Sequence, residues 1–175
     1  KEIIKAVEKI AGPRQQQQQQ QQQKGGEQQK ETPAPKPVEY DRTVEEITTQ
    51  AHWESKCTSK PGLCGVAFLD PEDGGEERNN RFVEALKTVL EKVYKNVHIM
   101  WMNGPRQSAV YDKFRLAGGF PAFAIYQPKI KRVVPYRGSF TAEDMLEWIE
   151  GKVLAGRPAS FEVDSIPAIK EQEKQ

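Results

Sequence analysis

The stretch Leu63-Cys64-Gly65-Val66-Ala67-Phe68-Leu69 is a continuous apolar run. It is too short for a helix, and its composition is typical of a central parallel strand that is covered on both faces. A Pro61-Gly62 turn precedes the run, and a polar loop from Asp70 to Glu77 follows it. We therefore expect a buried strand in the middle of a sheet, with the other elements arranged around it.

The residues after this strand alternate between helical and strand patterns. Phe82, Leu86, Val89 and Val93 form one apolar stripe, widened by Val83, Leu90 and Tyr94, which predicts a helix over Asn79–Tyr94. The next expected elements are a strand over Val97–Met102, a helix over Ser108–Leu116 and a strand over Ala122–Tyr126. An antiparallel strand over Arg132–Tyr136 follows, and Pro135 places it near an edge of the sheet. Thr141, together with Asp144, caps a last helix, whose core-facing residues are Met145, Leu146, Trp148 and Ile149.

The residues before the central strand predict one more strand and one more helix. The strand covers Val44–Ile47, and Thr48 or Thr49 caps a helix that carries Ala51, Trp53 and Cys57. The resulting order is β-α-β-α-β-α-β-β-α. Parallel strands joined by helices, followed by a hairpin and a helix, predict a three-layer α/β sandwich with a mixed central sheet.

Composition divides the 175 residues into a folded part and a polar N-terminal part. The hydrophobic share of 37% is an average, because the N-terminal part contains a glutamine run from Gln15 to Gln23 and a series of prolines. We expect residues 1–12 to be the end of a preceding domain's last helix, residues 13–38 a flexible, disordered linker rich in glutamine and proline, residues 39–161 a single domain, and residues 162–175 a polar C-terminal tail. The chain starts at Lys1 without an initiator methionine, which indicates a fragment or a processed chain.

The charge pattern excludes two classes of partner. The 26 Lys and Arg residues are interspersed with 25 Asp and Glu residues, giving a formal net charge of +1. This pattern argues against nucleic acid as the main partner. No stretch approaches the roughly 18 consecutive apolar residues that a membrane span requires, so we expect no membrane insertion.

Several motifs together resemble a known family. Gly118-Gly119-Phe120-Pro121-Ala122 occupies the place of the thioredoxin loop whose proline is cis. The other motifs that carry the resemblance are Cys57 and Cys64 around a Pro-Gly turn, Arg78-Asn79-Asn80 at the start of the long helix, the strand with Trp101, and Arg137-Gly138-Ser139-Phe140 before the last helix. Over about Val38 to Phe161 the chain resembles the non-catalytic third thioredoxin-like domain of endoplasmic-reticulum protein disulfide isomerases in which two catalytic domains precede one inactive domain.

This resemblance implies a thioredoxin fold and a parent protein that forms and isomerises disulfides in secretory proteins. It implies the endoplasmic-reticulum lumen as the location, unfolded or partly folded secretory proteins as partners, and the luminal Hsp70 chaperone as a further partner. It implies no cofactor.

The resemblance does not extend to catalysis, because the residues of the redox motif are absent. In active domains a Cys-Gly-His-Cys motif lies between the first central strand and the long helix, where the helix N-terminus lowers the pKa of the nucleophilic thiol. Here that interval runs from Asp70 to Arg78 and contains no cysteine. Its carboxylates would raise the pKa of a thiol, and Val66–Leu69 lacks the buried carboxylate of active domains. We therefore expect no catalytic residue in this chain.

Cys57 and Cys64 are predicted to form a structural disulfide. Their spacing is not that of a redox Cys-x-x-Cys motif, and His52 and His98, expected at the surface and the sheet edge, are not spaced to complete a zinc site. Two free thiols in a reducing compartment, or an exchanging pair in a thiol-disulfide enzyme, stay as alternatives. Weak calcium binding by Asp70, Glu72, Asp73, Glu76 and Glu77 is a further alternative, although the ligand spacing of an EF-hand is missing and our main expectation is no metal site.

Peptide binding is the remaining chemistry, because an extended chain can add to the sheet beside the cis-proline of a thioredoxin fold. The candidate residues for a peptide or partner are Gly119, Phe120, Pro121, Trp101, Met102 and Phe68. One alternative is that Phe68 and Trp101 are simply buried. Another is that the domain is a spacer or assembly element that sets the geometry between active domains.

Overall fold

The computed structural model describes residues 42–94, 96–156 and 158–171. The predictions for residues 1–12 and 13–38 lie outside the described residues. In chain order the elements are β1 (Glu45–Glu46), α2 (Gln50–Trp53), the π-helical turn η2 (Glu54–Thr58), β2 (Leu63–Leu69), α3 (Gly75–Lys92), β3 (Val97–Asn103), α4 (Ser108–Lys113), β4 (Ala122–Gln127), β5 (Arg132–Pro135), α5 (Ala142–Trp148), the π-helical turn η3 (Ile149–Val153) and β6 (Phe161–Glu162). No helix in these ranges is long and apolar enough to cross a bilayer.

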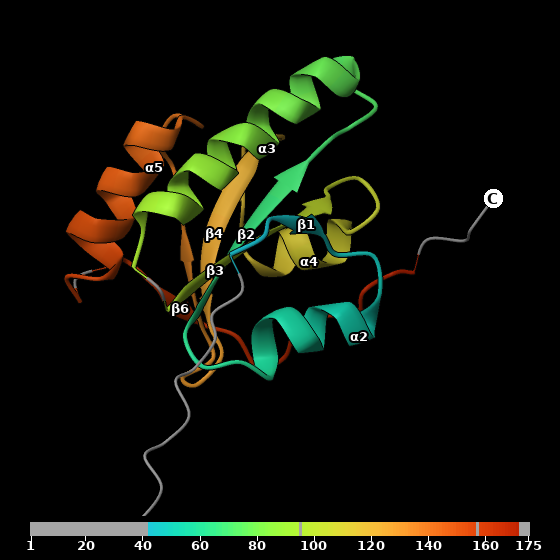
Figure 1. Cartoon of the computed structure of the whole chain (residues 1–175). Coiled ribbons are helices and arrows are strands. Elements are labelled where there is room, and N and C mark those ends of the chain that lie inside the picture. The colour runs from blue at the N-terminus through green and yellow to red at the C-terminus, as the bar shows by residue number, and fades with distance from the viewer. Residues whose placement is uncertain (1–41, 95, 157, 172–175) are drawn as a thin grey trace, which may run out of the picture. The chain divides into compact units, whose positions relative to one another are not determined.

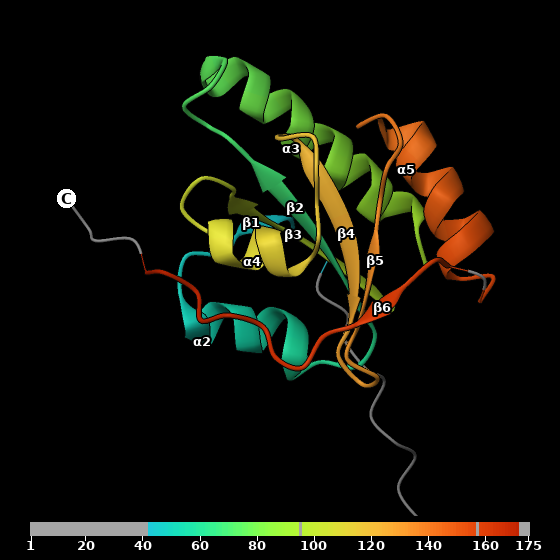
Figure 2. The same ribbon diagram turned by 180° about the vertical axis from the view of Figure 1, so that it is seen from behind.

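The strands form one mixed sheet in the order β1-β3-β2-β4-β5-β6. β1 and β2 both pair parallel to β3, whereas β4 runs antiparallel to β2, β5 to β4, and β6 to β5. Helices α3 and α5 cover one face of the sheet, and α2 and α4 cover the other (Figures 1 and 2). The predicted three-layer α/β sandwich with a mixed sheet is therefore confirmed.

β2 is the centre of this arrangement, as its composition predicts. Its bounds coincide with the apolar run, and every residue from Cys64 to Leu69 is buried. Pairing with β3 spans Leu63↔Val97 to Leu69↔Asn103, and pairing with β4 spans Cys64↔Tyr126 to Phe68↔Ala122. A strand with neighbours on both sides and helices on both faces has no solvent-facing side, which is why it needs no alternation of polar residues.

Two hydrophobic clusters lie on opposite faces of the sheet. The first, which we call the α2/α4 face, includes Trp53, Cys57, Cys64, Phe68 and Phe114. The second, the α3/α5 face, includes Leu86, Leu90, Phe123, Met145 and Ile149. Because side chains alternate along a strand, neighbouring residues such as Ala67 and Phe68 contribute to different clusters.

The long helix differs from its prediction at both ends. α3 starts at Gly75, four residues before Asn79, so that Glu76 and Glu77 stand in its first turn, where carboxylates favour the positive end of the helix dipole. It ends at Lys92, and Tyr94 lies beyond it with 74% of its surface exposed. Tyr94 therefore does not widen the apolar stripe.

The capping predictions agree with the structure. Of the two candidates before α2, Thr49 is the N-cap, and its hydroxyl accepts a hydrogen bond from the His52 amide at 3.1 Å. The Thr141 hydroxyl accepts from the Asp144 amide at 3.3 Å and caps α5. On this last helix Met145 and Ile149 are fully buried, whereas Trp148 is only half-buried.

The C-terminal residues are not the polar tail that the sequence predicts for 162–175. Phe161 and Glu162 form the extra edge strand β6, which pairs with Arg132 and Val133 of β5. Val163 and Ile169 are buried, and Ile166 packs against the α2/α4 cluster. The segment therefore belongs to the fold as far as the described residues extend.

Candidate functional site

The cis-proline loop lies where β4 begins. The Phe120–Pro121 peptide bond is cis, and Gly118 and Gly119 have φ angles of 99° and 81°, which an L side chain rarely adopts. The Tyr111 hydroxyl of α4 bonds both backbone groups of Gly119, accepting from its N–H at 3.1 Å and donating to its carbonyl at 3.2 Å. One side chain thus fixes the loop from the neighbouring helix.

Phe120 is held half-buried beside this loop. Its ring lies 5.0 Å from that of Tyr111, centroid to centroid, and it packs against Gly104, where a Cβ atom would collide with it. The β2–β4 pairing ends at Phe68↔Ala122, so the backbone of Phe120 lies beyond the last paired residues of the sheet. The loop therefore presents an aromatic side chain, and a backbone outside the β2–β4 pairing, at one end of the sheet.

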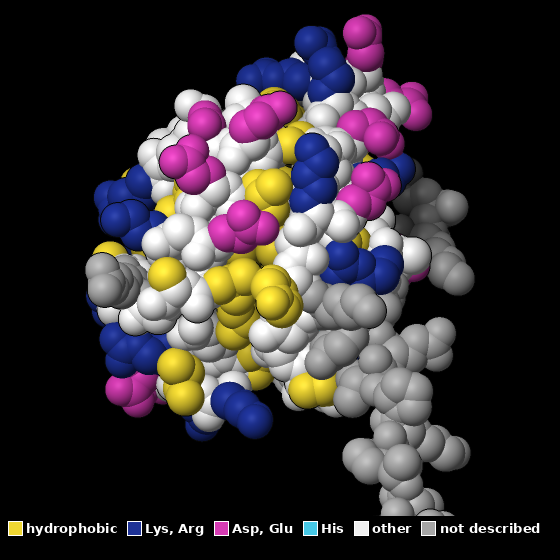
Figure 3. Space-filling model, turned by 60° about the vertical axis from the view of Figure 1, so that its left-hand side comes forward, with side chains coloured by type: hydrophobic (Ala, Val, Ile, Leu, Met, Phe, Trp, Pro, Cys, Tyr) yellow, Lys and Arg dark blue, Asp and Glu magenta, His cyan; other side chains and the backbone are white. Residues whose placement is uncertain are grey.

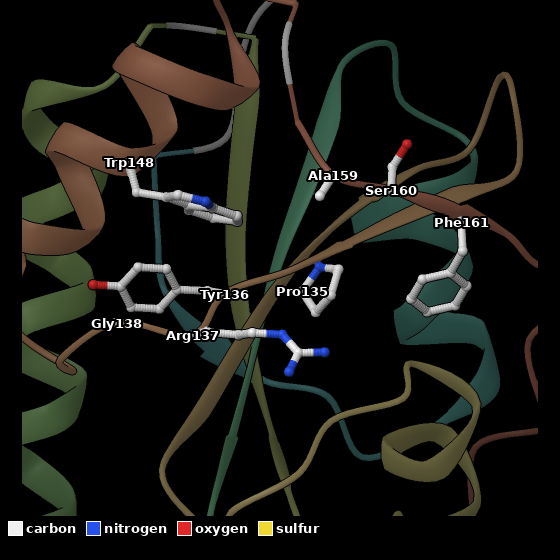
Figure 4. Close-up of a pocket in the computed structure, with 8 residues that line it drawn as sticks. All are labelled: Pro135, Tyr136, Arg137, Gly138, Trp148, Ala159, Ser160 and Phe161. Carbon is white, nitrogen blue, oxygen red and sulfur yellow. The ribbon is translucent and has the colours of Figure 1, made fainter.

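A second hollow, the aromatic pocket, lies between α5, the end of β5 and the segment before β6. Its volume is about 510 Å³, and it is lined by Pro135, Tyr136, Arg137, Gly138, Trp148, Ala159, Ser160 and Phe161. The Tyr136 and Trp148 rings, 4.9 Å apart, form one wall, Phe161 lies on the other side, and Pro135 lies between them (Figure 4). Hydrophobic side chains gather in the middle of the α5 side of the molecule, below a group of carboxylates (Figure 3).

The phenol of Tyr136 is neutral in this setting. Partial burial raises its pKa above the ordinary value, and the negative charges of Asp144 and Glu147 raise it further. The Tyr136 hydroxyl donates to the Ser139 carbonyl at 2.7 Å. Arg137 is exposed at the mouth of the pocket, so the pocket combines aromatic walls with one cationic group.

The two cysteines are joined in a disulfide on the α2/α4 face. Cys57 in η2 and Cys64 in β2 are both completely buried, with Cα atoms 5.6 Å apart. Cys64 stands near the start of β2, and the loop before α3 follows its end, so about 17 Å of strand separates them. Neither sulfur is accessible to a client thiol in this fold.

The loop before α3 is internally hydrogen-bonded. The Asp70 carboxylate accepts from the amides of Glu72 and Asp73 at 3.1 and 3.2 Å, and Arg78 contacts the Asp73 carboxylate at 3.4 Å. Within the described residues, no group of three or more His, Cys, Asp or Glu side chains is arranged to hold a metal ion. The loop therefore supplies neither a thiol nor a set of ligands for the alternative of calcium binding.

Comparison with known proteins shows which sequences and structures this chain is similar to. No protein-family model matches the chain. Protein disulfide isomerase-like 2-3 of Oryza sativa subsp. japonica is 28% identical over 133 residues, covering 74% of this chain and 30% of the relative. Protein disulfide-isomerase 2-3 of Arabidopsis thaliana is 29% identical over 117 residues, covering 65% of this chain and 26% of the relative. The chain thus spans less than a third of the length of either relative.

A solved thioredoxin domain is similar in fold. The first thioredoxin domain of mouse protein disulfide-isomerase A4 superposes with a TM-score of 0.51 at 15% identity, over 80% of this chain and 98% of that one. The chain therefore has a thioredoxin-like fold, and its sequence is similar to those of protein disulfide isomerases.

The fold does not bring all six candidate residues together. Gly119, Phe120 and Pro121 lie at the surface of the loop, but Phe68 and Met102 are completely buried on the α2/α4 face. Trp101 packs with the cluster on the opposite face. The prediction of one surface from all six is corrected: Phe68 and Met102 have no exposed area to offer a peptide, and Trp101 points away from them.

Sequence reasoning does not find the role of the Tyr111 hydroxyl or the aromatic pocket. Tyr111 packs against the α2/α4 cluster, and its hydroxyl also positions the cis-proline loop. The helical pattern places Trp148 in the core, but it is half-buried because it forms one wall of the pocket. Strand alternation is the available signal that separates Trp101 from Met102, since neighbouring residues of a strand point to opposite faces.

The two histidines contact different partners. His52 is half-buried and contacts the Glu45 carboxylate at 3.1 Å, and Lys56 contacts the same carboxylate at 3.0 Å. The hydrogen bond from Lys56, and then that from His52, hold the pKa of Glu45 below its ordinary value. His98 is buried on β3, with a ring nitrogen 3.0 Å from the Pro61 carbonyl.

Proposed function

We propose that this chain is a redox-inactive thioredoxin-like domain of an endoplasmic-reticulum protein disulfide isomerase, and that it binds extended client polypeptides or a chaperone partner, such as the luminal Hsp70, on behalf of catalytic domains elsewhere in the parent protein. The similarity to protein disulfide isomerases of plants supports the proposal that the parent protein is a protein disulfide isomerase. The resemblance to the non-catalytic third domain supports the proposed position of this domain after two catalytic domains.

The observation that carries the proposal is the location of the cysteines. Thiol-disulfide exchange requires a thiolate that can attack a disulfide in the client. Both sulfurs are here bonded to each other and fully buried, and the loop before α3 carries carboxylates in place of a thiol. The domain therefore keeps the fold of a redox enzyme without its reactive group.

Binding is assigned to the cis-proline loop. Gly119 is exposed, Phe120 offers part of its ring, and the backbone there lies beyond the last β2–β4 pair. Both backbone groups of Gly119 are bonded to the Tyr111 hydroxyl, so an extended peptide would pair with the backbone of Phe120 while one of its apolar side chains contacts the Phe120 ring. The aromatic pocket near Tyr136 and Trp148 is a second apolar surface of the same domain.

The first test is catalytic. The full chain is assayed for reduction of insulin disulfides by dithiothreitol, beside a catalytic thioredoxin domain at the same concentration. We expect no acceleration over dithiothreitol alone. A rate comparable to that of the catalytic domain would instead favour the thiol-disulfide exchange enzyme that uses Cys57 and Cys64.

Redox titration separates the same two alternatives independently. A buried structural disulfide should have a reduction potential below about −300 mV, whereas an exchanging pair should lie near the luminal range of roughly −180 to −210 mV. We expect the lower value, because reduction requires opening of the core around Cys57 and Cys64.

The second test addresses binding. Phe120→Asp places a charge on the proposed surface, and we expect about a tenfold weaker affinity for a fluorescently labelled unfolded polypeptide such as reduced, alkylated ribonuclease. Tyr94→Asp is the matched control, because Tyr94 is exposed just before β3, at the other end of the sheet. Equal affinity of the wild type and both variants would contradict the assigned surface and favour the spacer or assembly role.

A further inference from the structure

The segment that follows β6 is a candidate for a second function, independent of the cis-proline loop. Residues 163–170, which we call the C-terminal strap, leave the sheet after Val163 donates to the Lys131 carbonyl at 2.8 Å. The strap then runs along α2 on the α2/α4 face (Figure 2). It has no helical or strand structure of its own.

The side chains of the strap that pack on the α2/α4 cluster recur every third residue, at Val163, Ile166 and Ile169. Val163 and Ile169 are buried, and Ile166 between them packs on the α2/α4 cluster, which also contains Trp53 and Cys57. Asp164, Ser165, Ala168 and Lys170 are exposed. A period of three is that of the polyproline II conformation, which proteins recognise in extended ligands. The strap therefore occupies its groove as an extended peptide ligand would.

Two glutamine side chains hold the backbone of the strap. The Gln50 side-chain oxygen accepts from the Ile169 amide at 2.9 Å. Gln107 makes a two-point contact with Lys170, donating to its carbonyl at 2.8 Å and accepting from its amide at 3.0 Å. The amide of Gln107 thus pairs with one residue as a neighbouring strand would, and this pairing does not depend on the side chain at position 170.

The burial of Gln107 shows that this contact is built into the fold. Its exposed fraction is 3%, and a buried primary amide is costly unless its donor and acceptor are both satisfied. The backbone of Lys170 satisfies one of each. A groove that contains such an amide requires a polypeptide backbone, or water, at this place.

We propose that this groove is a binding site for an extended segment of another polypeptide with aliphatic residues at three-residue intervals, and that the C-terminal strap is its occupant within the chain. Such a segment replaces the strap by placing three aliphatic side chains where Val163, Ile166 and Ile169 lie and by pairing its backbone with Gln50 and Gln107. The site lies on the α2/α4 face and does not use Phe120.

The strap is tethered to the domain and competes with any added peptide for the site, so the test must first release it. A tethered ligand acts at an effective concentration of the order of millimolar, so a free peptide binds the wild-type chain weakly. The full chain carrying Ile166→Asp and Ile169→Asp should release the strap while leaving Gln50 and Gln107 unchanged. The probe is a fluorescein-labelled peptide with the sequence of residues 161–171, titrated by fluorescence anisotropy.

We expect the strap variant to bind this peptide at least tenfold more tightly than the wild-type chain does. Ile169→Asp in the peptide, or Gln107→Leu added to the chain variant, should weaken binding at least tenfold. Asp164→Asn in the peptide is the matched control and should leave the affinity unchanged, because Asp164 is exposed. Absence of binding to a folded strap variant, or binding that ignores Ile169→Asp in the peptide, overturns the proposal.

Hydrogen exchange of the wild-type chain tests the proposal even where the strap variant does not fold. A replaceable strap opens without global unfolding, so the amides of Ile169 and Lys170 should exchange at least tenfold faster than that of Val66 in the core of β2. Exchange of all three amides at the rate of global unfolding means that the strap does not leave its groove, and overturns the proposal.

Discussion

The two faces of the sheet are stabilised differently. On the α3/α5 face, packing of aromatic and aliphatic side chains holds two helices to the sheet, and a pocket is left open beside Trp148. On the α2/α4 face, the first helix has only four residues in α2 and five in the π-helical turn η2. A disulfide and the C-terminal strap tie this face together. The comparison indicates that short elements receive covalent and backbone support where packing alone would not suffice.

The largest effect is expected from removal of packing on the α3/α5 face. Phe123 is fully buried, its ring lies about 6 Å from those of Tyr136 and Trp148, and it fills the space over Gly65. Phe123→Ala should lower the free energy of unfolding by about 4 kcal/mol in urea denaturation. Val83→Ala, on the half-buried flank of α3, should cost about 1 kcal/mol. Similar losses for the two variants would show that this face does not depend on its aromatic centre.

The next effect concerns the disulfide of the α2/α4 face. Replacing both Cys57 and Cys64 with Ala should lower the free energy of unfolding by about 2.5 kcal/mol, because the cross-link closes a short loop of the unfolded chain. Hydrogen exchange should become faster at the amides of α2 and η2 while those of α3 change only with global stability. Equal acceleration of hydrogen exchange in α2, η2 and α3 would contradict the idea that the disulfide supports the α2/α4 face in particular.

A smaller effect is expected from the strap contact. Gln107→Ala removes both hydrogen bonds to the Lys170 backbone and should cost about 1–2 kcal/mol. The amide of Lys170 should lose its protection in hydrogen exchange, whereas that of Val66 in β2 should keep it. Gln127→Ala, at the end of β4, is the control and should leave the protection of Lys170 unchanged.

The smallest effect is a pH dependence at the edge of the α2/α4 face. The pKa of Glu45 is lowered in the folded state by Lys56 and His52, so its contribution is complete above the ordinary value of 4.5 and is lost as the pH falls through the lower folded-state pKa. Glu45 is half-exposed, which limits the contribution to less than about 1 kcal/mol. The difference in stability between wild type and Glu45→Gln, measured from pH 7 to pH 3, should therefore shrink with acidification.

The fold was predictable where composition decides it. The apolar runs of β2 and β4 specify buried strands with few alternatives, and the bounds of β2 agree to the residue. The start of α3 was not predictable, because Gly75 and Glu76 carry no apolar period. The strap was not predictable for a related reason: packing at 163, 166 and 169 follows neither the period of a strand nor that of a helix.

The candidate site was predictable only in part. Gly119, Phe120 and Pro121 follow from the loop motif, which is local in sequence. Phe68 and Met102 were misplaced because their strands are buried along almost their whole length, so no polar residue marks which face each side chain takes. The aromatic pocket depends on where residues 159–161 cross beside Trp148, which is a long-range property of the chain.

Both edges of the sheet end in strands of only two residues, β1 with Glu45 and Glu46 and β6 with Phe161 and Glu162. Beyond the reach of β6, the outer strand β5 carries Pro135, which lacks the N–H group that a further strand would need. Short, charged or proline-bearing edges are poor templates for pairing between molecules. We therefore expect such edges to make the domain a poor nucleus for fibrils even at high concentration.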